Sequence, residues 1–332
     1  MSQFKPPALL RGPHTQSIVA RVGIRSARVR ARAAELLSAS EDIIADVGHG
    51  VRLLVHHTPP RGDGNGRLAA LLHGWEGSAM ATYVLSVSDR LWRKGYRIVR
   101  INLRDHGDSH HLNEEMFHSC RLDEVVGAVR WTQSEFPRDD LFLIGSSLGG
   151  NFALRIAAGA SNSGLDIRRV IAICPVLDPE QTMHALDHGS RIYQRYFMRR
   201  WRVSLERKKA AFPQRFDFTR LEQFRTLEDM TDYFVRNYTE YPDLTTYLRG
   251  YALTGERLEN LEVPSTMLLA EDDPVIPVAG LERIARPDCL RIETTPHGGH
   301  CGFISDLKLN SWADQFVDRE LERNWRGRSA SQ

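Results

Sequence analysis

The sequence contains little cysteine. Four cysteines occur among 332 residues, and no two have the C-x-x-C spacing. Scattered cysteines of this kind favour neither a disulfide framework nor a zinc site. One of them, Cys174, stands in an apolar run and is interpreted as a core-filling residue. We therefore expect a reducing compartment, no bound metal and no cofactor.

Long apolar runs are also missing. No run approaches the ~20 apolar residues that a membrane-spanning helix needs, and the opening residues Met-Ser-Gln-Phe-Lys-Pro-Pro lack an apolar signal core. These absences predict a soluble, cytoplasmic protein. The formal net charge is only +2, so nucleic acid is not an expected partner. The sequence predicts no particular oligomeric state.

Apolar runs that are present alternate with helical patterns. Strands are expected over 43–47, 51–56, 68–72, 97–103, 141–144, 170–174, 265–270 and 290–293. Helices are expected over 82–94 and 148–160, around 122–129, and near 312–317. Strands that alternate with helices of this length predict βαβ units and a mostly parallel sheet flanked by helices, here with an antiparallel hairpin at its start.

The chain divides into four predicted segments. Residues 1–40 form an amino-terminal arm, 41–177 and 251–332 form the two parts of an α/β core, and 178–250 form a helical cap insertion. The cap has many aromatics and no convincing strand, and we expect it over the carboxyl ends of the strands, where α/β sheets bind ligands.

Basic residues gather in the arm and in the cap. The arm is interpreted as a solvated, partly helical lead-in, with a membrane- or anion-binding patch as the alternative. The basic run of the cap is interpreted as a solvated helix face. Its members are Arg199, Arg200, Arg202, Arg207, Lys208 and Lys209.

The segment Gly145-Ser146-Ser147-Leu148-Gly149 carries the strongest chemical signal. It fits G-x-S-x-G, a nucleophile elbow between a strand and a helix. Positions two before and two after the serine must be tiny, which the glycines satisfy. This spacing selects Ser147 over Ser146 as the nucleophile.

A serine hydroxyl needs a base, and the base needs an orienting acid. His300 and His297 follow the last strand, and His300 is favoured because the glycines before it let the backbone fold the imidazole over the serine. Asp273 is favoured over Asp272 because two following prolines fix its loop. Asp178 is a third and weaker candidate. The chain order Ser, Asp, His is the one that this fold uses.

Two backbone N–H groups are expected to hold an oxyanion. One belongs to Leu148, directly after the nucleophile. The other is expected from Trp75, in the loop that Gly74 keeps tight after the strand 68–72.

Four histidines near Asp105 and Asp108 are the other conspicuous cluster. A metal site is conceivable there, but the spacing matches no standard ligand set, so a polar loop is the preferred interpretation. The histidines are His106, His110, His111 and His118.

Several of these motifs together resemble the YheT-like branch of the α/β-hydrolases, an esterase and lipase group. The likeness runs from Phe4 to about Trp312. Its carriers are Phe4-Lys-Pro-Pro, His14-Thr-Gln-Ser-Ile18, His73-Gly-Trp-Glu-Gly-Ser78, Asn102-Leu-Arg-Asp-His-Gly107, Ser147-Leu-Gly-Gly-Asn151, Asp272-Asp-Pro-Val-Ile-Pro277 and Gly298-Gly-His-Cys-Gly-Phe303. Asp105 departs from the family, because such sequences usually place glycine there.

The resemblance implies an α/β-hydrolase fold, a triad of Ser147, Asp273 and His300, and carboxylesterase or acylglycerol-lipase activity. The sequence therefore predicts a serine hydrolase that cleaves short- to medium-chain esters or acylglycerols through an acyl-enzyme. Its expected partner is a small-molecule or lipid-like ester, and peripheral membrane contact is compatible with the basic arm. The alternatives are an acyltransferase with the same triad and a non-catalytic binding protein of this fold.

Overall fold

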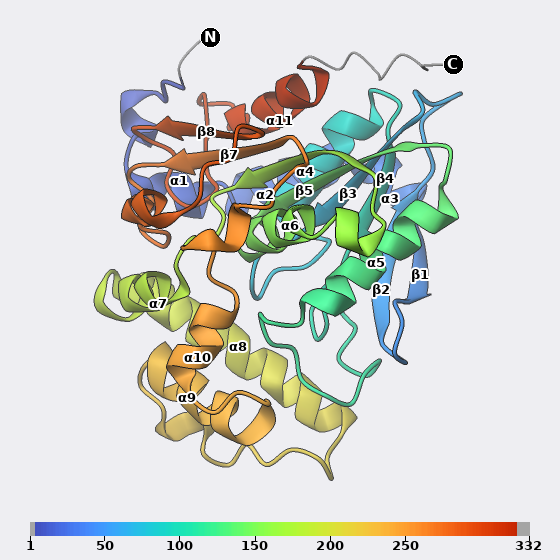
Figure 1. Cartoon of the computed structure of the whole chain (residues 1–332). Helices are drawn as coiled ribbons and strands as arrows, with labels where there is room; N and C mark the ends of the chain where they lie inside the picture. Colours follow the sequence, from blue (N-terminus) through green and yellow to red (C-terminus); the bar gives the residue numbers. More distant parts are fainter. Residues whose placement is uncertain (1–3, 324–332) are drawn as a thin grey trace.

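The computed structural model describes residues 4–323, so the first three residues of the predicted arm and residues 324–332 of the predicted core lie outside it. Its centre is an eight-stranded sheet in the order β1-β2-β4-β3-β5-β6-β7-β8 (Figure 1). The strands are β1 (Glu41–Asp46), β2 (Arg52–Thr58), β3 (Arg67–Leu72), β4 (Arg97–Ile101), β5 (Asp140–Ser146), β6 (Ile167–Ile173), β7 (Ser265–Ala270) and β8 (Leu290–Thr295).

The sheet is antiparallel at one edge and parallel elsewhere. β2 pairs antiparallel with both β1 and β4, whereas β3 to β8 pair in parallel. This confirms the predicted mostly parallel sheet and its antiparallel edge. Because parallel strands end at one edge of the sheet, the loops after β3, β5, β7 and β8 gather there.

Side chains of the central strands alternate between two apolar cores. Leu141 and Leu143 of β5 point to one face, and Phe142 and Ile144 point to the other. Both faces are buried because helices cover each of them, as parallel sheets require. The first face carries α5 (Leu122–Glu135) and α6 (Leu148–Ala158). The second carries α2 (Gly23–Arg32), α3 (Ala34–Ser38), α4 (Thr82–Trp92) and α11 (Trp312–Glu322).

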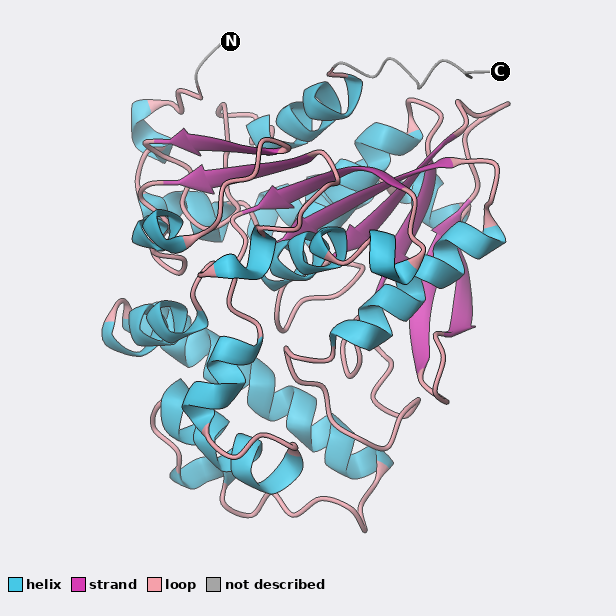
Figure 2. Cartoon of the chain, viewed as in Figure 1, coloured by secondary structure: helices cyan, strands magenta, loops and turns pink. Residues whose placement is uncertain are grey.

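Between β6 and β7 the chain forms four α-helices, which lie below the sheet in Figure 1. Figure 2 shows that this group contains helices and loops but no strand. The helices are α7 (Pro179–His188), α8 (Arg191–Ala211), α9 (Leu227–Tyr238) and α10 (Leu244–Gly250). Among the described residues, none of the protein's helices is both long enough and apolar enough to cross a membrane.

The basic run of α8 is not uniformly solvated. Its interpretation as a solvated helix face is wrong for Lys208. The side chain of Lys208 is 1% exposed and its Nζ lies 2.9 Å from Asp105 Oδ1. The same Nζ donates to the carbonyl oxygens of Asn113 and Glu115, at 2.5 and 3.0 Å. Lys208 therefore binds α8 to the loop after β4.

The arm is also more than a solvated lead-in. It forms a short turn (Ala8–Leu10), α1 (Pro13–Val19), α2 and α3. Gln16, Ser17 and Arg25 are buried polar residues. Gln16 Nε2 donates to the carbonyl oxygen of Ile304 at 3.1 Å, and the Ile304 N–H donates back to Gln16 Oε1 at 2.7 Å. The arm is thus packed against the loop that carries His300.

Candidate active site

Ser147 sits at a strained turn between β5 and α6. Its φ is 55° and its ψ is −122°, a backbone region that non-glycine residues rarely adopt. A Cβ at Gly145 would lie 2.1 Å from the carbonyl oxygen of Gly149, and a Cβ at Gly149 would lie 2.4 Å from that of Leu72. The two flanking glycines are therefore required by close backbone approaches, as the motif predicts.

The structure brings Ser147, His300 and Asp273 into one hydrogen-bonded chain. His300 Nε2 lies 3.0 Å from Ser147 Oγ, and His300 Nδ1 lies 2.9 Å from Asp273 Oδ2. The side chains of His300 and Asp273 are 2% and 1% exposed. A base shielded from water and held on both nitrogens can take the serine proton without reorienting.

The loop before His300 depends on two glycines with positive φ. Gly298 has φ 149° and Gly299 has φ 52°. A Cβ at Gly299 would lie 2.3 Å from the carbonyl oxygen of Pro13, so the arm packs directly on this loop. Ser17 Oγ accepts the His300 N–H at 2.8 Å. The arm therefore fixes the backbone of His300.

The other acid candidates have different partners. Asp273 Oδ1 accepts the N–H groups of Val275 and Ile276, at 2.8 and 3.0 Å, which leaves Oδ2 to His300. Asp272 Oδ1 accepts the Gly299 N–H at 2.8 Å, so it supports the histidine loop. Asp178 caps the N-terminus of α7.

His297, the second histidine candidate, does not belong to the hydrogen-bonded chain of Ser147, His300 and Asp273. The His297 side chain is 39% exposed, and its Nδ1 lies 3.6 Å from Asp272 Oδ2. His297 lies on the loop surface, as expected. Of the two histidines, the structure places His300 and not His297 against Ser147.

Two opposing effects act on the pKa of His300. Burial lowers the pKa, and the adjacent Asp273 carboxylate raises it, with a net rise above the usual value of histidine. The carboxylate therefore compensates for burial and stabilises the imidazolium that proton transfer from Ser147 would create.

Both predicted oxyanion donors have free N–H groups. Leu148 is the first residue of α6, so its N–H has no partner within the helix. In the loop after β3, the Gly74 N–H donates to the Tyr83 hydroxyl, the Glu76 N–H to His106 Nε2 and the Gly77 N–H to the Gly74 carbonyl. Across the described part of the chain, the Trp75 N–H has no such acceptor.

Gly74 itself is required by a close approach. A Cβ at this position would lie 3.0 Å from Ser147 Cβ. The loop that carries Trp75 thus touches Ser147, and the distance leaves no room for a side chain between them.

The predicted histidine cluster does not form a metal site among residues 4–323. His106, His110 and His118 are buried polar residues, and burial lowers the pKa of His106 and His110 to about 4 and that of His118 to about 3. His106 accepts the Glu76 N–H, so it supports the oxyanion loop.

Metal-ligating atoms do converge at another place. Cys174, Cys301 and His300 place one ligand atom each within 4.8 Å of one another. Both nitrogens of His300 are already committed to Ser147 and Asp273, so we assign no metal to this group. Cys174 is fully buried, in agreement with its interpretation as a core residue.

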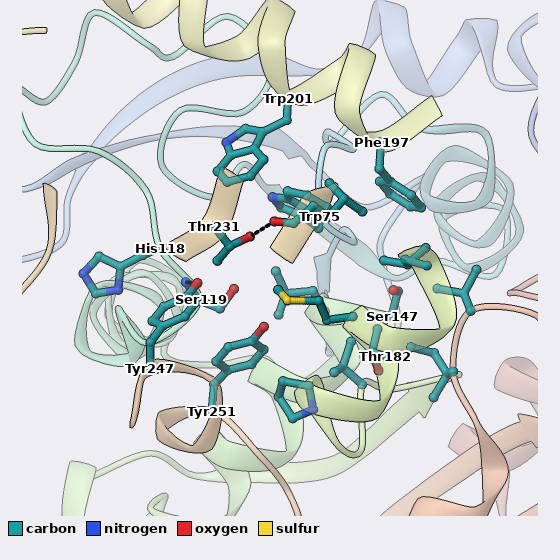
Figure 3. Close-up of a pocket in the computed structure, with 18 of the residues that line it drawn as sticks. Trp75, His118, Ser119, Ser147, Thr182, Phe197, Trp201, Thr231, Tyr247 and Tyr251 are labelled. Atoms are coloured by element: carbon teal, nitrogen blue, oxygen red, sulfur yellow. Dashed lines mark hydrogen bonds between the residues drawn. The ribbon is translucent and has the colours of Figure 1, made fainter. Parts of the chain in front are cut away.

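An apolar cavity opens beside Ser147. Figure 3 shows Phe197 and Trp201 projecting from α8 toward Trp75, with Ser147 below them. The Trp75 and Phe197 rings stack at 5.3 Å, and Trp201 meets Trp75 edge-on at 5.3 Å. The cavity continues past Ser147 and Leu148 toward the hydroxyl of Tyr251. Its walls suit an apolar group attached to the serine.

Sequence reasoning missed the supporting residues Ser17 and Tyr83. Tyr83 Oη accepts the Gly74 N–H at 2.8 Å, which orients the loop of Trp75. In the sequence, the run His14-Thr-Gln-Ser-Ile18 supports only the resemblance. The burial of its glutamine and serine is seen only in the structure.

Known proteins have sequences similar to that of this chain. A family model described as the alpha/beta hydrolase family matches residues 70–312. The chain is 26% identical to the putative esterase YheT of Escherichia coli, over 72% of this chain and 71% of that protein. It is 23% identical to the monoacylglycerol lipase ABHD2 of Danio rerio, over 71% of this chain and 60% of that protein.

Solved structures share the fold. The esterase Pf2001 of Pyrococcus furiosus superposes with a TM-score of 0.57 at 15% identity, over 87% of this chain and 94% of that chain. Est1E of Butyrivibrio proteoclasticus, solved with ferulic acid, superposes with a TM-score of 0.54 at 17% identity, over 84% and 98%.

Proposed function

The chain belongs to the alpha/beta hydrolase family, and from this premise we propose that it hydrolyses carboxylic esters through an acyl-enzyme formed on Ser147. The observation that carries the proposal is the continuous contact from Ser147 Oγ through His300 to the Asp273 carboxylate, with distances of 3.0 and 2.9 Å. Such a chain activates a serine hydroxyl that is otherwise a poor nucleophile.

In the proposed reaction, Ser147 Oγ attacks the ester carbonyl carbon while His300 Nε2 takes the serine proton. The N–H groups of Leu148 and Trp75 hold the negatively charged oxygen of the tetrahedral intermediate. His300 then protonates the leaving alcohol oxygen, and the acyl group remains on Ser147. Water attacks the acyl-enzyme by the same steps in reverse and releases the acid.

We further propose that residues 178–250 act as a cap that shapes the acyl site. Leu186 of α7, Phe197 and Trp201 of α8, and Leu227 of α9 line the apolar cavity beside Ser147. Apolar walls of this kind favour a hydrocarbon chain. The proposed substrates are therefore short- to medium-chain acyl esters or acylglycerols, as the sequence predicts.

A fluorophosphonate probe should label the wild-type protein and the Ser146→Ala variant, and should fail to label Ser147→Ala. Only an activated serine attacks the phosphorus of such a probe. Ser146 is the matched control because it is the neighbouring hydroxyl, whereas His300 forms its side-chain hydrogen bonds with Ser147 and Asp273. Intact-protein mass spectrometry measures the added mass.

Two outcomes would contradict the proposal. A folded wild-type protein that takes up no probe would favour a non-catalytic binding role, and labelled Ser147→Ala would place the nucleophile elsewhere. Product analysis with added alcohols separates the remaining alternative, since an acyltransferase would form a new ester in place of the free acid.

The acidic limb of a kcat/KM profile against pH should have its midpoint above 6.5, the usual pKa of histidine. Protonated His300 cannot accept the Ser147 proton, and its pKa is raised by the Asp273 carboxylate against the lowering effect of burial. Activity is then lost as pH falls through this raised pKa. In Asp273→Asn the midpoint should move to lower pH, because the main contribution that raises the pKa of His300 is lost while burial still lowers it. An unchanged midpoint in that variant would remove Asp273 from the proposed role.

A further inference from the structure

A second cavity opens on the other side of His300. It lies between the turn that joins α1 to α2 and the start of α8, and it is lined by Ser17, Arg21, Val22, Ile192, Tyr196 and His300. An adjoining cavity connects Arg21 with Ser147 and His300 directly. Because His300 protonates the leaving oxygen in the proposed reaction, the alcohol portion of the ester belongs on this side of the site. The apolar cavity beyond Leu148 is then left for the acyl portion.

Arg21 is an unpaired cation in the second cavity. Within residues 4–323 its guanidinium makes no hydrogen bond or ion pair, and its Nε is buried without a partner. Its guanidinium lies over the Tyr83 ring, whose centroid is 5.7 Å away. Buried polar groups are normally hydrogen-bonded, so such a donor requires an explanation.

Three other arginines of the arm, Arg25, Arg28 and Arg32, bind groups within the protein. Arg25 Nη1 donates to the Ala20 carbonyl at 2.5 Å, and Arg28 Nη1 donates to the Lys308 carbonyl at 3.2 Å. Arg32 Nε lies 2.9 Å from Asp89 Oδ2. Arg21 differs from these three arginines because its Nε is buried without a partner and it lines both cavities.

The acidic groups near Arg21 form no ion pair with it among the described residues. Against the lowering effect of burial, Cys301 and Asp273 raise the pKa of Arg21, but the Asp273 oxygens accept from His300, Val275 and Ile276. Glu76 lines the adjoining cavity, and burial raises its pKa to about 8. Arg30 and Arg200 line the same space, so three arginines can offer charged donors to an anion there.

We propose that Arg21 binds a carboxylate or phosphate on the alcohol portion of the ester, so that the enzyme selects esters whose leaving alcohol is anionic. A guanidinium fork matches both groups with paired hydrogen bonds. The inference rests on the proposed function and specifies its substrate class. It makes Arg21 a specificity-determining residue of the leaving-group side.

Three butyrate esters with matched alcohols test the proposal. The alcohols are propane-1,3-diol, which is neutral, 3-hydroxypropanoate, which carries a carboxylate, and 3-hydroxypropyl phosphate. Wild-type kcat/KM for an anionic ester should exceed that for the neutral ester by about 10- to 100-fold, the size expected for hydrogen bonds to a charged group. In Arg21→Gln the ratio should fall to about one, while Arg21→Lys should retain part of it.

The ratio of two substrates on one protein is independent of general losses of folded enzyme, so a purely structural role of Arg21 would leave it unchanged. Arg28→Gln is the control because it removes an exposed arginine of the same arm and should keep the wild-type ratio. Preference for either anionic ester supports the proposal and identifies the anion. Hydrolysis of all three esters at similar rates, or an Arg21→Gln variant with the wild-type ratio, would overturn it while the proposed function stands. If the wild type hydrolyses none of these esters, and none of a wider ester panel, the proposed function itself fails.

Discussion

Replacing His300 with alanine should lower kcat by about 10⁶-fold, and adding Ser147→Ala to that variant should lower it hardly further. The two side chains act as one unit, because His300 Nε2 lies 3.0 Å from Ser147 Oγ and a serine without its base is as inert as no serine. Asp273→Asn should cost about 10⁴-fold, since it would hold His300 in the wrong tautomer. Steady-state kinetics on one activated butyrate ester measures all three variants and the double variant.

Fold integrity must be shown for each of these variants by circular dichroism and urea unfolding. His297→Ala is the matched control: it removes the neighbouring loop histidine, whose side chain is 39% exposed, and should keep activity near the wild-type level. Losses in the double variant that equal the product of the single losses would contradict the shared role. Residual activity within a few-fold of wild type in His300→Ala would assign the base to another residue.

Replacing Lys208 with methionine should lower the free energy of unfolding by about 3–5 kcal/mol, the usual result of removing one partner of a buried ion pair. The Asp105 carboxylate would remain buried without its cation, since its Oδ1 lies 2.9 Å from Lys208 Nζ. The carbonyl oxygens of Asn113 and Glu115 would also lose their donor. Urea unfolding measures the difference.

Lys209→Met is the control for this change. It alters the adjacent lysine, which has no such buried carboxylate partner, and should change stability by no more than about 0.5 kcal/mol. Adding Asp105→Gly to Lys208→Met should recover part of the loss, because it removes the unpaired charge and glycine readily adopts the φ of 58° found at Asp105. Equal effects of Lys208→Met and Lys209→Met would show that the ion pair contributes no net stability.

The fold and the strand positions could be predicted from patterns within short stretches of the sequence. The α/β-hydrolase fold is confirmed, and each strand of the sheet lies within a few residues of its expected position. The elbow at Ser147 can be recognised from the sequence because the close approach that requires its glycines is local. Gly145 and Gly149 contact each other within one five-residue segment. Asp273 and His300 were found because each follows a strand that ends at the same edge of the sheet. His300 contacts Ser147 and Asp273 contacts His300, in the order expected, and their catalytic roles stay predictions.

The residues whose burial the sequence did not predict have partners far away along the chain. From the sequence, Lys208 is one more basic residue in a run expected to be solvated. Its burial depends on Asp105, which lies 103 residues earlier in the chain. Ser17 and Arg21 looked like parts of a loose basic arm for the same reason. A charged side chain is buried only where a partner or a ligand awaits it, and that partner leaves no trace in the local sequence.

The contact between Ser17 and His300 joins residues 283 positions apart. During synthesis the arm leaves the ribosome well before β8 and the loop that carries His300. At about 5–20 residues per second, some 14–57 s separate the two. The hydrophobic faces of β5 and α6 can begin to pack in that interval, but the proposed catalytic chain cannot close. We therefore expect nascent chains that end before β8 to be inactive toward esters, with activity arising only as the last strand joins the sheet.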